Sequence, residues 1–261
     1  MLKELQARLQ QGHRTIRFPK AQPVLPDRYR GRPTIEGSKC SANCRDCRDV
    51  CPTQAIGPSR IDLGRCLFCG HCEKACPQKA VAFSREFRMA VRTRDDLILN
   101  DSTLKLAQAL DKKMRRLLGR SLKLRLVSAG GCNACEADTN VLNTVVFDLG
   151  RFGIQFVASP RHADGLVITG PVTQNMRLAL MKTYDAAGSP KIVIAVGACA
   201  ISGGPYVDHS EVHNGAGNCL PIDLYVPGCP PHPLTILDGL LRLVYPTIFP
   251  FAWNECDCTR P

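Results

Sequence analysis

Eight of the cysteines in this chain form a pattern that occurs twice, and this repeat restricts the possible folds more than any other feature. The first run reads CSANCRDCRDVCP and the second reads CLFCGHCEKACP. The last three cysteines of each run, the proline after them and Ala55 or Ala80 recur at an offset of 25 residues, which indicates a duplicated half-unit. Thiols gathered this closely are typical of metal or iron–sulfur ligation.

The whole chain has 15 cysteines among 261 residues, too many for incidental core thiols. It begins without a signal-peptide pattern, so we expect a cytoplasmic protein, in which disulfides are rare and ligation explains so many thiols. The longest apolar region, 233–253, is interrupted by Asp238, Arg242, Pro246 and Pro250. We therefore predict no transmembrane helix.

The second run resembles the two-cluster bacterial ferredoxins, in which the fourth cysteine of each C-x2-C-x2-C-x3-C-P run binds the other cluster. The resemblance covers about residues 36–84. It implies that one [4Fe–4S] cluster takes Cys40, Cys44, Cys47 and Cys76, and that the other takes Cys66, Cys69, Cys72 and Cys51. The first run departs by one residue, since three residues follow Cys40. Structural zinc sites are the alternative, although zinc usually binds C-x2-C pairs separated by a long gap.

A helix is predicted at 101–119, DSTLKLAQALDKKMRRLLG. Asp101 or Ser102 can cap its start, and Gly119 can close it. Apolar residues recur at helical spacing, at Leu104, Ala107, Leu110, Met114 and Leu117. We expect an amphipathic connector between two domains.

From residue 122 onward, apolar runs alternate with helical patterns. We predict strands at 123–128, 154–159, 165–169, 191–196 and 224–226, and helices near 136–149, 174–187 and 233–244. This alternation is typical of an open parallel α/β sheet. Such sheets bind ligands at the carboxyl ends of their strands, where the strand order reverses.

Four cysteines follow three of these predicted strands. Cys132 and Cys135 come after the first strand, Cys199 after the fourth and Cys229 after the fifth, and glycines accompany each of them. Because these strand ends meet at one edge of the sheet, the four thiols predict a third cluster site, where glycines let the backbone approach and donate N–H groups to sulfur. A thioredoxin-like redox pair at Cys132 and Cys135 is the alternative, but it leaves the other two cysteines unexplained.

The motifs GCNACE, FDLGRFGIQFVASPRHADGLVITGPV, GACAISGG and YVPGCPP resemble, in this order, a known family. It is the small subunit of energy-converting [NiFe] hydrogenases (group 4, like hydrogenase-3 of formate hydrogenlyase), which is related to the 20 kDa subunit of respiratory complex I. The resemblance spans about residues 122–245 and implies a flavodoxin-like domain. It also implies that Cys132, Cys135, Cys199 and Cys229 bind the [4Fe–4S] cluster nearest the active site of a large partner subunit. Two residues separate the first two cysteines in the hydrogenase branch, as here, whereas the complex I branch has them adjacent.

This resemblance implies an oxidoreductase subunit that carries electrons and contributes no catalytic residue. Three [4Fe–4S] clusters would connect the nickel–iron site of the [NiFe] hydrogenase large subunit with a ferredoxin or a formate or CO dehydrogenase module. The expected location is the inner face of the cytoplasmic membrane, where membrane subunits of the complex hold the chain peripherally. A complex I-like quinone oxidoreductase subunit is the nearest alternative.

The formal charge of +11 raises a distant alternative, a zinc-dependent nucleic-acid-binding module. Each oxidised cubane with four thiolates carries about −2, so three of them reduce the total to about +5. Few aromatic residues flank the basic stretches, which argues against base stacking. We expect no nucleic-acid partner.

The expected organisation has five parts: an N-terminal strap at 1–35, an α+β ferredoxin-like two-cluster domain at 36–98, a helical connector at 99–121, an α/β flavodoxin-like domain with an open parallel sheet at 122–246, and a C-terminal tail at 247–261. The strap and the tail are candidates for contacts with neighbouring subunits. Cys219 is expected to be a free thiol, and Cys256 and Cys258 fall short of a ligand set. Glu136 either assists proton movement or bonds the backbone at a helix start.

Overall fold

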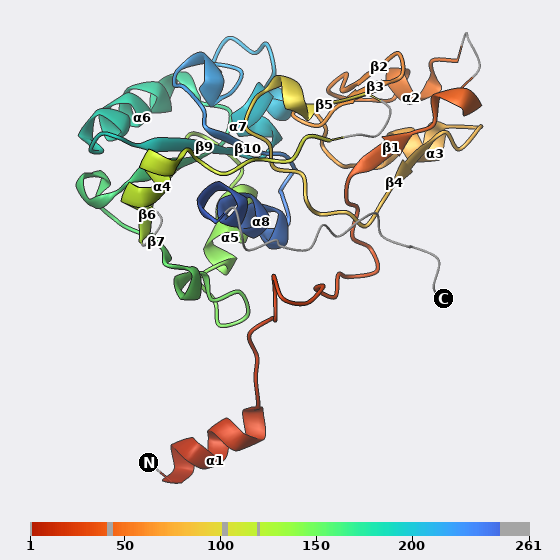
Figure 1. Ribbon diagram of the computed structural model, residues 1–261. Helices are drawn as coiled ribbons and strands as arrows, with labels where there is room; N and C mark the ends of the chain where they lie inside the picture. The colour runs from red at the N-terminus through yellow and green to blue at the C-terminus, as the bar shows by residue number, and fades with distance from the viewer. Residues whose placement is uncertain (1, 41–43, 101–103, 119–120, 246–261) are drawn as a thin grey trace.

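A computed structural model describes residues 2–40, 44–100, 104–118 and 121–245. Figure 1 shows a larger lobe around a parallel sheet and a smaller lobe that carries two short antiparallel sheets. Within the described residues, no helix has both the length and the apolar character needed to cross a membrane.

The larger lobe contains a five-stranded parallel sheet with the strand order β10-β9-β8-β6-β7. Its strands are β6 (Leu122–Ser128), β7 (Ile154–Phe156), β8 (Gly165–Thr169), β9 (Ile192–Val196) and β10 (Leu224–Val226). In order along the chain this is the 2-1-3-4-5 arrangement of flavodoxin-like folds, and the strand order reverses between β6 and β8. The predicted α/β flavodoxin-like domain with a parallel sheet is confirmed.

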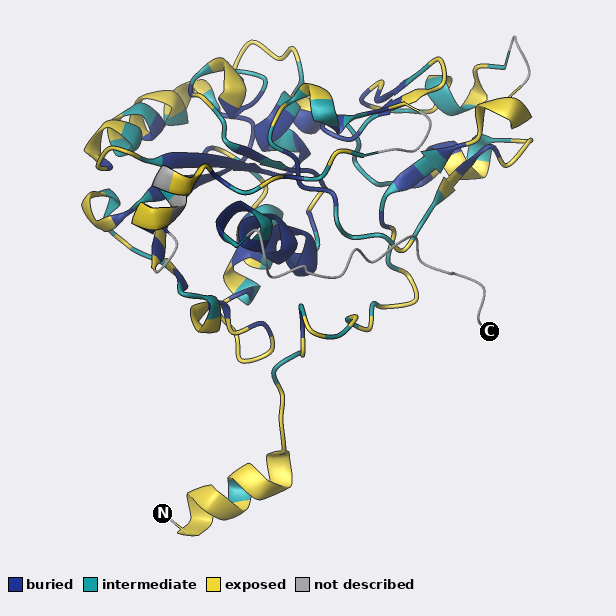
Figure 2. Ribbon diagram, viewed as in Figure 1, coloured by how far each residue is buried: buried dark blue, intermediate teal, exposed yellow. Residues whose placement is uncertain are grey.

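Helices cover both faces of this sheet (Figure 1). On one side lie α5 (Ala134–Val141) and α8 (Pro233–Val244), and on the other lie α6 (Gln174–Ala186) and α7 (Ala198–Ser202). Every residue of β8 and β9 is buried, and so is nearly all of α8 (Figure 2). The apolar runs that predict β8 and β9 are continuous because both faces of the sheet are covered there.

The first helix of this lobe is shorter than the predicted helix at 136–149. It ends at Val141, and a 3-10 turn, η3 (Leu149–Phe152), follows the loop. The loop contains the β-branched residues Thr144, Val145 and Val146, which lower helix propensity. The carbonyls of Val145 and Val146 accept hydrogen bonds from the N-terminal segment instead of from their own helix.

The smaller lobe has two copies of one structural pattern. Strand β1 (Pro33–Ile35) pairs with β4 (Val81–Phe83), and β3 (Arg60–Asp62) pairs with both β2 (Ile56–Gly57) and β5 (Ile98–Asn100). One short helix in each half carries a cysteine motif, α2 (Asp46–Asp49) and α3 (His71–Ala75). The 3-10 turns η1 (Gly37–Lys39) and η2 (Asp95–Leu97) precede Cys40 and β5.

The prediction of a connector helix at 101–119 is wrong for residues 104–111. Helix α4 covers only Lys112–Leu118. The N–H of Ala107 donates to the carbonyl of Ala90 at 2.7 Å, and that of Leu110 donates to Leu243 at 3.0 Å, so these groups bond to neighbouring elements and not within a helix. Both side chains are nonetheless buried, because an extended segment fills the same apolar space. The proposed caps Asp101, Ser102 and Gly119 lie outside the described residues.

The N-terminal segment runs along both lobes of its own chain. Helix α1 (Leu2–Gln11) stands away from the body with its leucines exposed, whereas residues 15–18 bond to the larger lobe (Figure 2). There Arg151 donates to the carbonyls of Ile16 and Phe18, both at 2.9 Å. Further on, the segment enters the smaller lobe and ends in β1.

Candidate iron–sulfur sites

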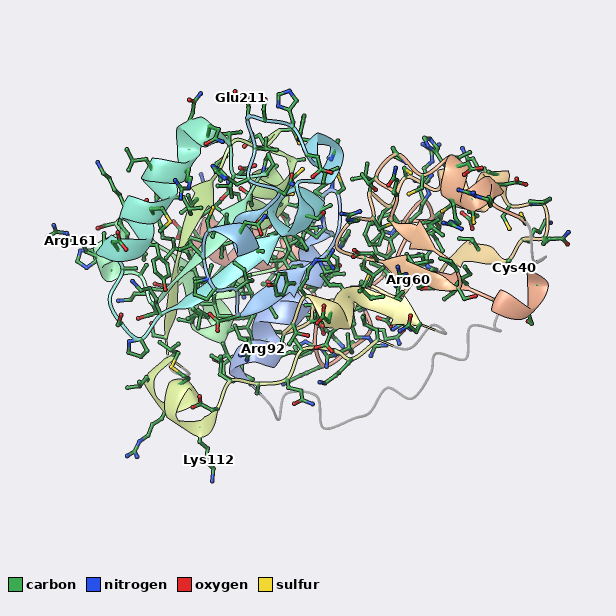
Figure 3. The ribbon with its side chains drawn as sticks, turned by 90° about the horizontal axis from the view of Figure 1, so that it is seen from above. Cys40, Arg60, Arg92, Lys112, Arg161 and Glu211 are labelled. Atoms are coloured by element: carbon green, nitrogen blue, oxygen red, sulfur yellow. The ribbon has the colours of Figure 1, made fainter. Side chains whose placement is uncertain are left out.

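The first thiol group comprises Cys40, Cys44, Cys47 and Cys76. Burial raises the pKa of Cys47, and the charges of Cys76, Cys40 and Cys44 raise it further. Cys76 comes from the other half of the repeat, so the structure brings thiols of both halves together; that these four thiols bind one cluster stays a prediction. Cys40 is exposed and lies on the smaller lobe far from the parallel sheet (Figure 3).

The second thiol group comprises Cys51, Cys66, Cys69 and Cys72. Burial raises the pKa of Cys66 to about 12, with further increases from Cys72, Cys51 and Cys69. Burial also raises the pKa of Cys72 to about 11, and this residue is buried. Neutral thiols are therefore strongly favoured when no cation is present, and bound iron supplies the opposing positive charge.

The fourth cysteine of each run, Cys51 or Cys76, accepts the same kind of backbone hydrogen bond in both halves of the repeat. The N–H of Ala55 donates to the Sγ of Cys51, and the N–H of Ala80 donates to the Sγ of Cys76, both at 3.2 Å. Gln54 and Lys79, one residue earlier, have φ values of 51° and 50°, which turn the chain back over the sulfur. N–H groups directed at sulfur are the environment of a cluster thiolate.

The third thiol group comprises Cys132, Cys135, Cys199 and Cys229. The first pair lies at the start of α5 after β6, Cys199 lies in α7 after β9, and Cys229 follows β10. Burial raises the pKa of Cys135, with contributions from Cys199, Cys229, Glu136 and Cys132. Burial raises the pKa of Cys199 to about 12, again with Cys229 and Cys132 as neighbours. Four thiols from three strand ends thus gather at one edge of the sheet.

Two glycines leave space for sulfur in the third group. Gly197 has φ 91° and ψ 157°, and a β-carbon there would lie 2.5 Å from the Sγ of Cys135. Gly204 has φ 56°, and a β-carbon there would lie 2.8 Å from the Sγ of Cys199. Any other residue would be strained at Gly197 and would press on a thiol. This cradle fits a group that needs close backbone approach, as a [4Fe–4S] cluster does.

The thiol groups are not arranged around single ions. Among the described residues, no group of three or more His, Cys, Asp or Glu side chains is placed to hold one metal ion. A cubane binds each of its four thiolates through a different iron, so its ligands stand around a larger object than one ion. The donor set of four thiolates in each group fits that object.

The second and third groups are close to each other. Cys69 is one of the charges that raise the pKa of Cys229, after burial and Cys132. The hydroxyl of Ser202, in the helix that carries Cys199, donates to the carbonyl of Gly64 at 2.8 Å. A cavity of about 250 Å³ at this junction is lined by Phe68, Cys229 and residues 28–30.

Arg30 was not identified from the sequence. Its guanidinium donates to the carbonyl of Phe68 at 3.4 Å and lies against Gly70, in the loop that holds Cys66 and Cys69. Its only sequence signal is a place in a basic, proline-rich segment. The contact between residues 30 and 68 exists only in the folded chain.

Several other residues have defined positions. The hydroxyl of Thr169 donates to Glu136 at 2.6 Å; burial opposes ionisation of Glu136, but the hydroxyls of Ser128 and Thr169 lower its pKa overall. Asp164 accepts a hydrogen bond from the N–H of Lys123 at 2.8 Å and so fixes the loop before β8. Cys219 packs beside an apolar core away from the thiol groups, and Cys256 and Cys258 lie outside the described residues.

Two family models match the chain. The model of the NADH ubiquinone oxidoreductase 20 Kd subunit matches residues 132–243, which contain the third thiol group. The model of a 4Fe-4S binding domain matches residues 59–82, which contain one cysteine run of the repeat. Iron–sulfur binding by the smaller lobe is thus supported by both its geometry and its family.

Curated relatives belong to two kinds of oxidoreductase complex. Formate hydrogenlyase subunit 7 of Escherichia coli (strain K12) is 41% identical over 143 residues, which are 55% of this chain and 54% of that protein. A probable membrane-bound hydrogenase subunit of Pyrococcus furiosus is 37% identical, over 54% of this chain and 85% of the relative. An NADH-quinone oxidoreductase subunit of Clostridium beijerinckii is 43% identical, over 46% of this chain and 72% of the relative.

The chain spans about half the length of the first relative and most of the other two. The family model that matches residues 132–243 covers the part of this chain that holds the third thiol group. A 4Fe-4S binding domain, at residues 59–82, lies ahead of that part. The chain belongs to the family of the complex I 20 kDa subunit and the [NiFe] hydrogenase small subunit.

Proposed function

We propose that this chain is the electron-transfer subunit of a membrane-associated [NiFe] hydrogenase complex. Its twelve grouped cysteines hold three [4Fe–4S] clusters, and its two lobes unite a ferredoxin with a hydrogenase small subunit. The observation that carries the proposal is the gathering of thiols into three groups of four, two across a sequence repeat and one across three strand ends.

The contacts between the three groups suggest the order in which they are connected. The third group adjoins the second through the contact of Ser202 with Gly64 and the proximity of Cys229 to Cys69. The second group shares its repeat with the first, whose Cys40 is exposed on the smaller lobe. Electrons therefore pass between the third group and the clusters of the smaller lobe, with the second group as the point of connection, in a direction that the redox partners determine.

The clusters supply one-electron transfer with little ligand motion. The residues of this chain fix the thiolates and direct N–H groups at some of them. Ala55 and Ala80 donate to sulfur in the smaller lobe, and Gly197 and Gly204 leave space beside sulfur in the larger lobe. Hydrogen bonds and burial of this kind set the reduction potential of each site.

The hydrogenase assignment is favoured by the spacing of the third group. Asn133 and Ala134 separate Cys132 from Cys135, and Asn133 has φ 69°, which turns the chain into α5 between the two thiols. The chain therefore has the hydrogenase form of this motif. A quinone-reducing subunit like that of complex I has adjacent cysteines here. The experiment below distinguishes that function from the hydrogenase function.

The third group is where the [NiFe] large subunit docks. Cys132 and Cys229 are exposed in this chain, although cluster ligands next to an active site are usually enclosed. A large subunit that covers these two thiols would complete the enclosure and place its nickel–iron centre beside the cluster. Membrane subunits of the same complex then hold this chain peripherally at the cytoplasmic membrane.

Hydrogen-dependent reduction of a viologen dye tests the proposal. The complex is purified anaerobically through a tag on this chain, and the reduced dye is followed by its absorbance. We expect activity that requires hydrogen. A preparation with intact partner subunits and clusters that dithionite reduces, yet without hydrogen-dependent activity, would replace the proposal with the quinone-linked function.

A further inference from the structure

A cavity of about 850 Å³ opens on the smaller lobe beside the second thiol group. It lies between α2, β3 and η2, and Cys51 is among the residues that line it. We call it the arginine groove, because five arginines and three aspartates carry all the charge of its lining: Arg45, Arg48, Arg60, Arg65 and Arg94, with Asp49, Asp62 and Asp95. Arg60 is marked on the smaller lobe in Figure 3.

Some of these arginines are already neutralised. Arg94 makes a two-pronged ion pair with Asp62, at 2.8 and 2.6 Å. Arg45 lies 3.8 Å from Asp49, and both side chains are largely exposed, so this pair contributes little. Arg48, Arg60 and Arg65 have no ion pair within the described parts of the chain. The groove therefore keeps an excess of positive charge.

The rest of the lining indicates which class of ligand the arginines bind. Guanidinium groups bind carboxylates in a two-pronged geometry, which suits aspartate and glutamate side chains. The described lining contains no aromatic side chain, so bases have nothing to stack on.

We propose that the arginine groove is the docking site of a small acidic electron-transfer protein, which exchanges electrons with the clusters of the smaller lobe. The proposal rests on the proposed function, since it names the partner of the same relay. Charge complementarity selects the partner, and the position of Cys51 in the lining brings the partner's own redox centre near a cluster ligand. One electron passes per encounter, so that one cluster is oxidised as the other is reduced.

The test uses the whole complex with the double substitution Arg48→Glu and Arg60→Glu. A matched control is Arg177→Glu, an exposed arginine on α6 in the other lobe. Hydrogen-dependent reduction is measured with two acceptors, methyl viologen and a purified acidic two-cluster ferredoxin. We expect kcat/KM for the ferredoxin to fall about 10-fold at low ionic strength and the difference to shrink as salt rises. The viologen rate and the control variant stay at the level of the unsubstituted complex.

Other outcomes overturn the inference. Equal ferredoxin rates in the double variant and the control place the docking site elsewhere. An equal fall with both acceptors, or a shift in cluster midpoint potential, means that the arginines act on the clusters. Loss of binding to phosphatidylglycerol vesicles with unchanged ferredoxin kinetics identifies a lipid surface. Absence of hydrogen-dependent viologen reduction in the unsubstituted complex is a separate result, which refutes the proposed function.

Discussion

Gly197→Ala isolates the fit of the third cluster site, because it adds one methyl group at a single place. The backbone there, at φ 91° and ψ 157°, lies in a region that is almost restricted to glycine. Holding alanine in it costs about 1–3 kcal/mol. The new β-carbon would also stand 2.5 Å from the Sγ of Cys135, about 1 Å inside normal contact.

Whether Cys135 is a free thiol or is bound to iron determines which form of the protein the contact destabilises. A free thiol turns away about its χ1 bond, whereas a thiolate bound to iron is fixed in place. The backbone strain weakens the fold with or without a cluster, whereas the contact with a fixed sulfur disfavours only the loaded site. Overpacking of this kind costs about 1–3 kcal/mol, which is about 5- to 150-fold in occupancy. Iron and labile sulfide, with electron paramagnetic resonance (EPR) of the reduced protein, measure this loss. We expect about twelve iron atoms per chain to fall toward about eight.

Gly188→Ala is the matched control. Gly188 is exposed, and a β-carbon there has no neighbouring atom within 4 Å, so iron content and thermal stability should match those of the unsubstituted protein. A Gly197→Ala protein that keeps its iron and an unchanged third EPR signal would refute the argument that Gly197 makes room for a bound thiolate. Thermal denaturation separates loss of the cluster from loss of the fold.

Three further predictions concern ligation and stability. Cys199→Ser should remove about four iron atoms per chain, whereas Cys219→Ser should remove none, and iron analysis with EPR decides between them. Asp62→Ala should lower the unfolding free energy by about 1.5–3 kcal/mol in denaturant titrations, because it removes the Arg94 ion pair and the acceptor of the Gly64 N–H; an unchanged midpoint would contradict this role. In the chain separated from its partners, chelator should remove iron last from the second thiol group, since the first and third groups contain exposed thiols; simultaneous release from all groups would contradict this order.

The sequence predicts the architecture well where patterns are local. The predicted strands lie on β6 to β10 within three residues at each end. The pattern is clearest for β8 and β9, in which every residue is buried, whereas β6 and β7 include exposed positions. In the smaller lobe each thiol group combines three cysteines of one run with one of the other, since Cys76 lies near Cys47 and Cys51 lies near Cys66. The assignment of each group to one cluster stays a prediction.

Contacts between distant segments are where the sequence prediction fails. Residues 104–111 have helical periodicity, yet their N–H groups bond to Ala90 and Leu243, which tertiary packing alone brings near. The same holds for Arg30 over the loop of the second thiol group and for the five arginines of the groove. The groove arginines come from four elements or turns, and their proximity depends on how the two halves of the repeat pack.

The relay order is tested most directly by reducing the complex with hydrogen and recording EPR spectra of the clusters. In the unsubstituted complex, hydrogen should reduce all three clusters. In Cys199→Ser, which removes a ligand of the third group, hydrogen should leave the two clusters of the smaller lobe oxidised, although dithionite still reduces them. Hydrogen reduction of the smaller-lobe clusters in that variant would contradict a relay that enters through the third group.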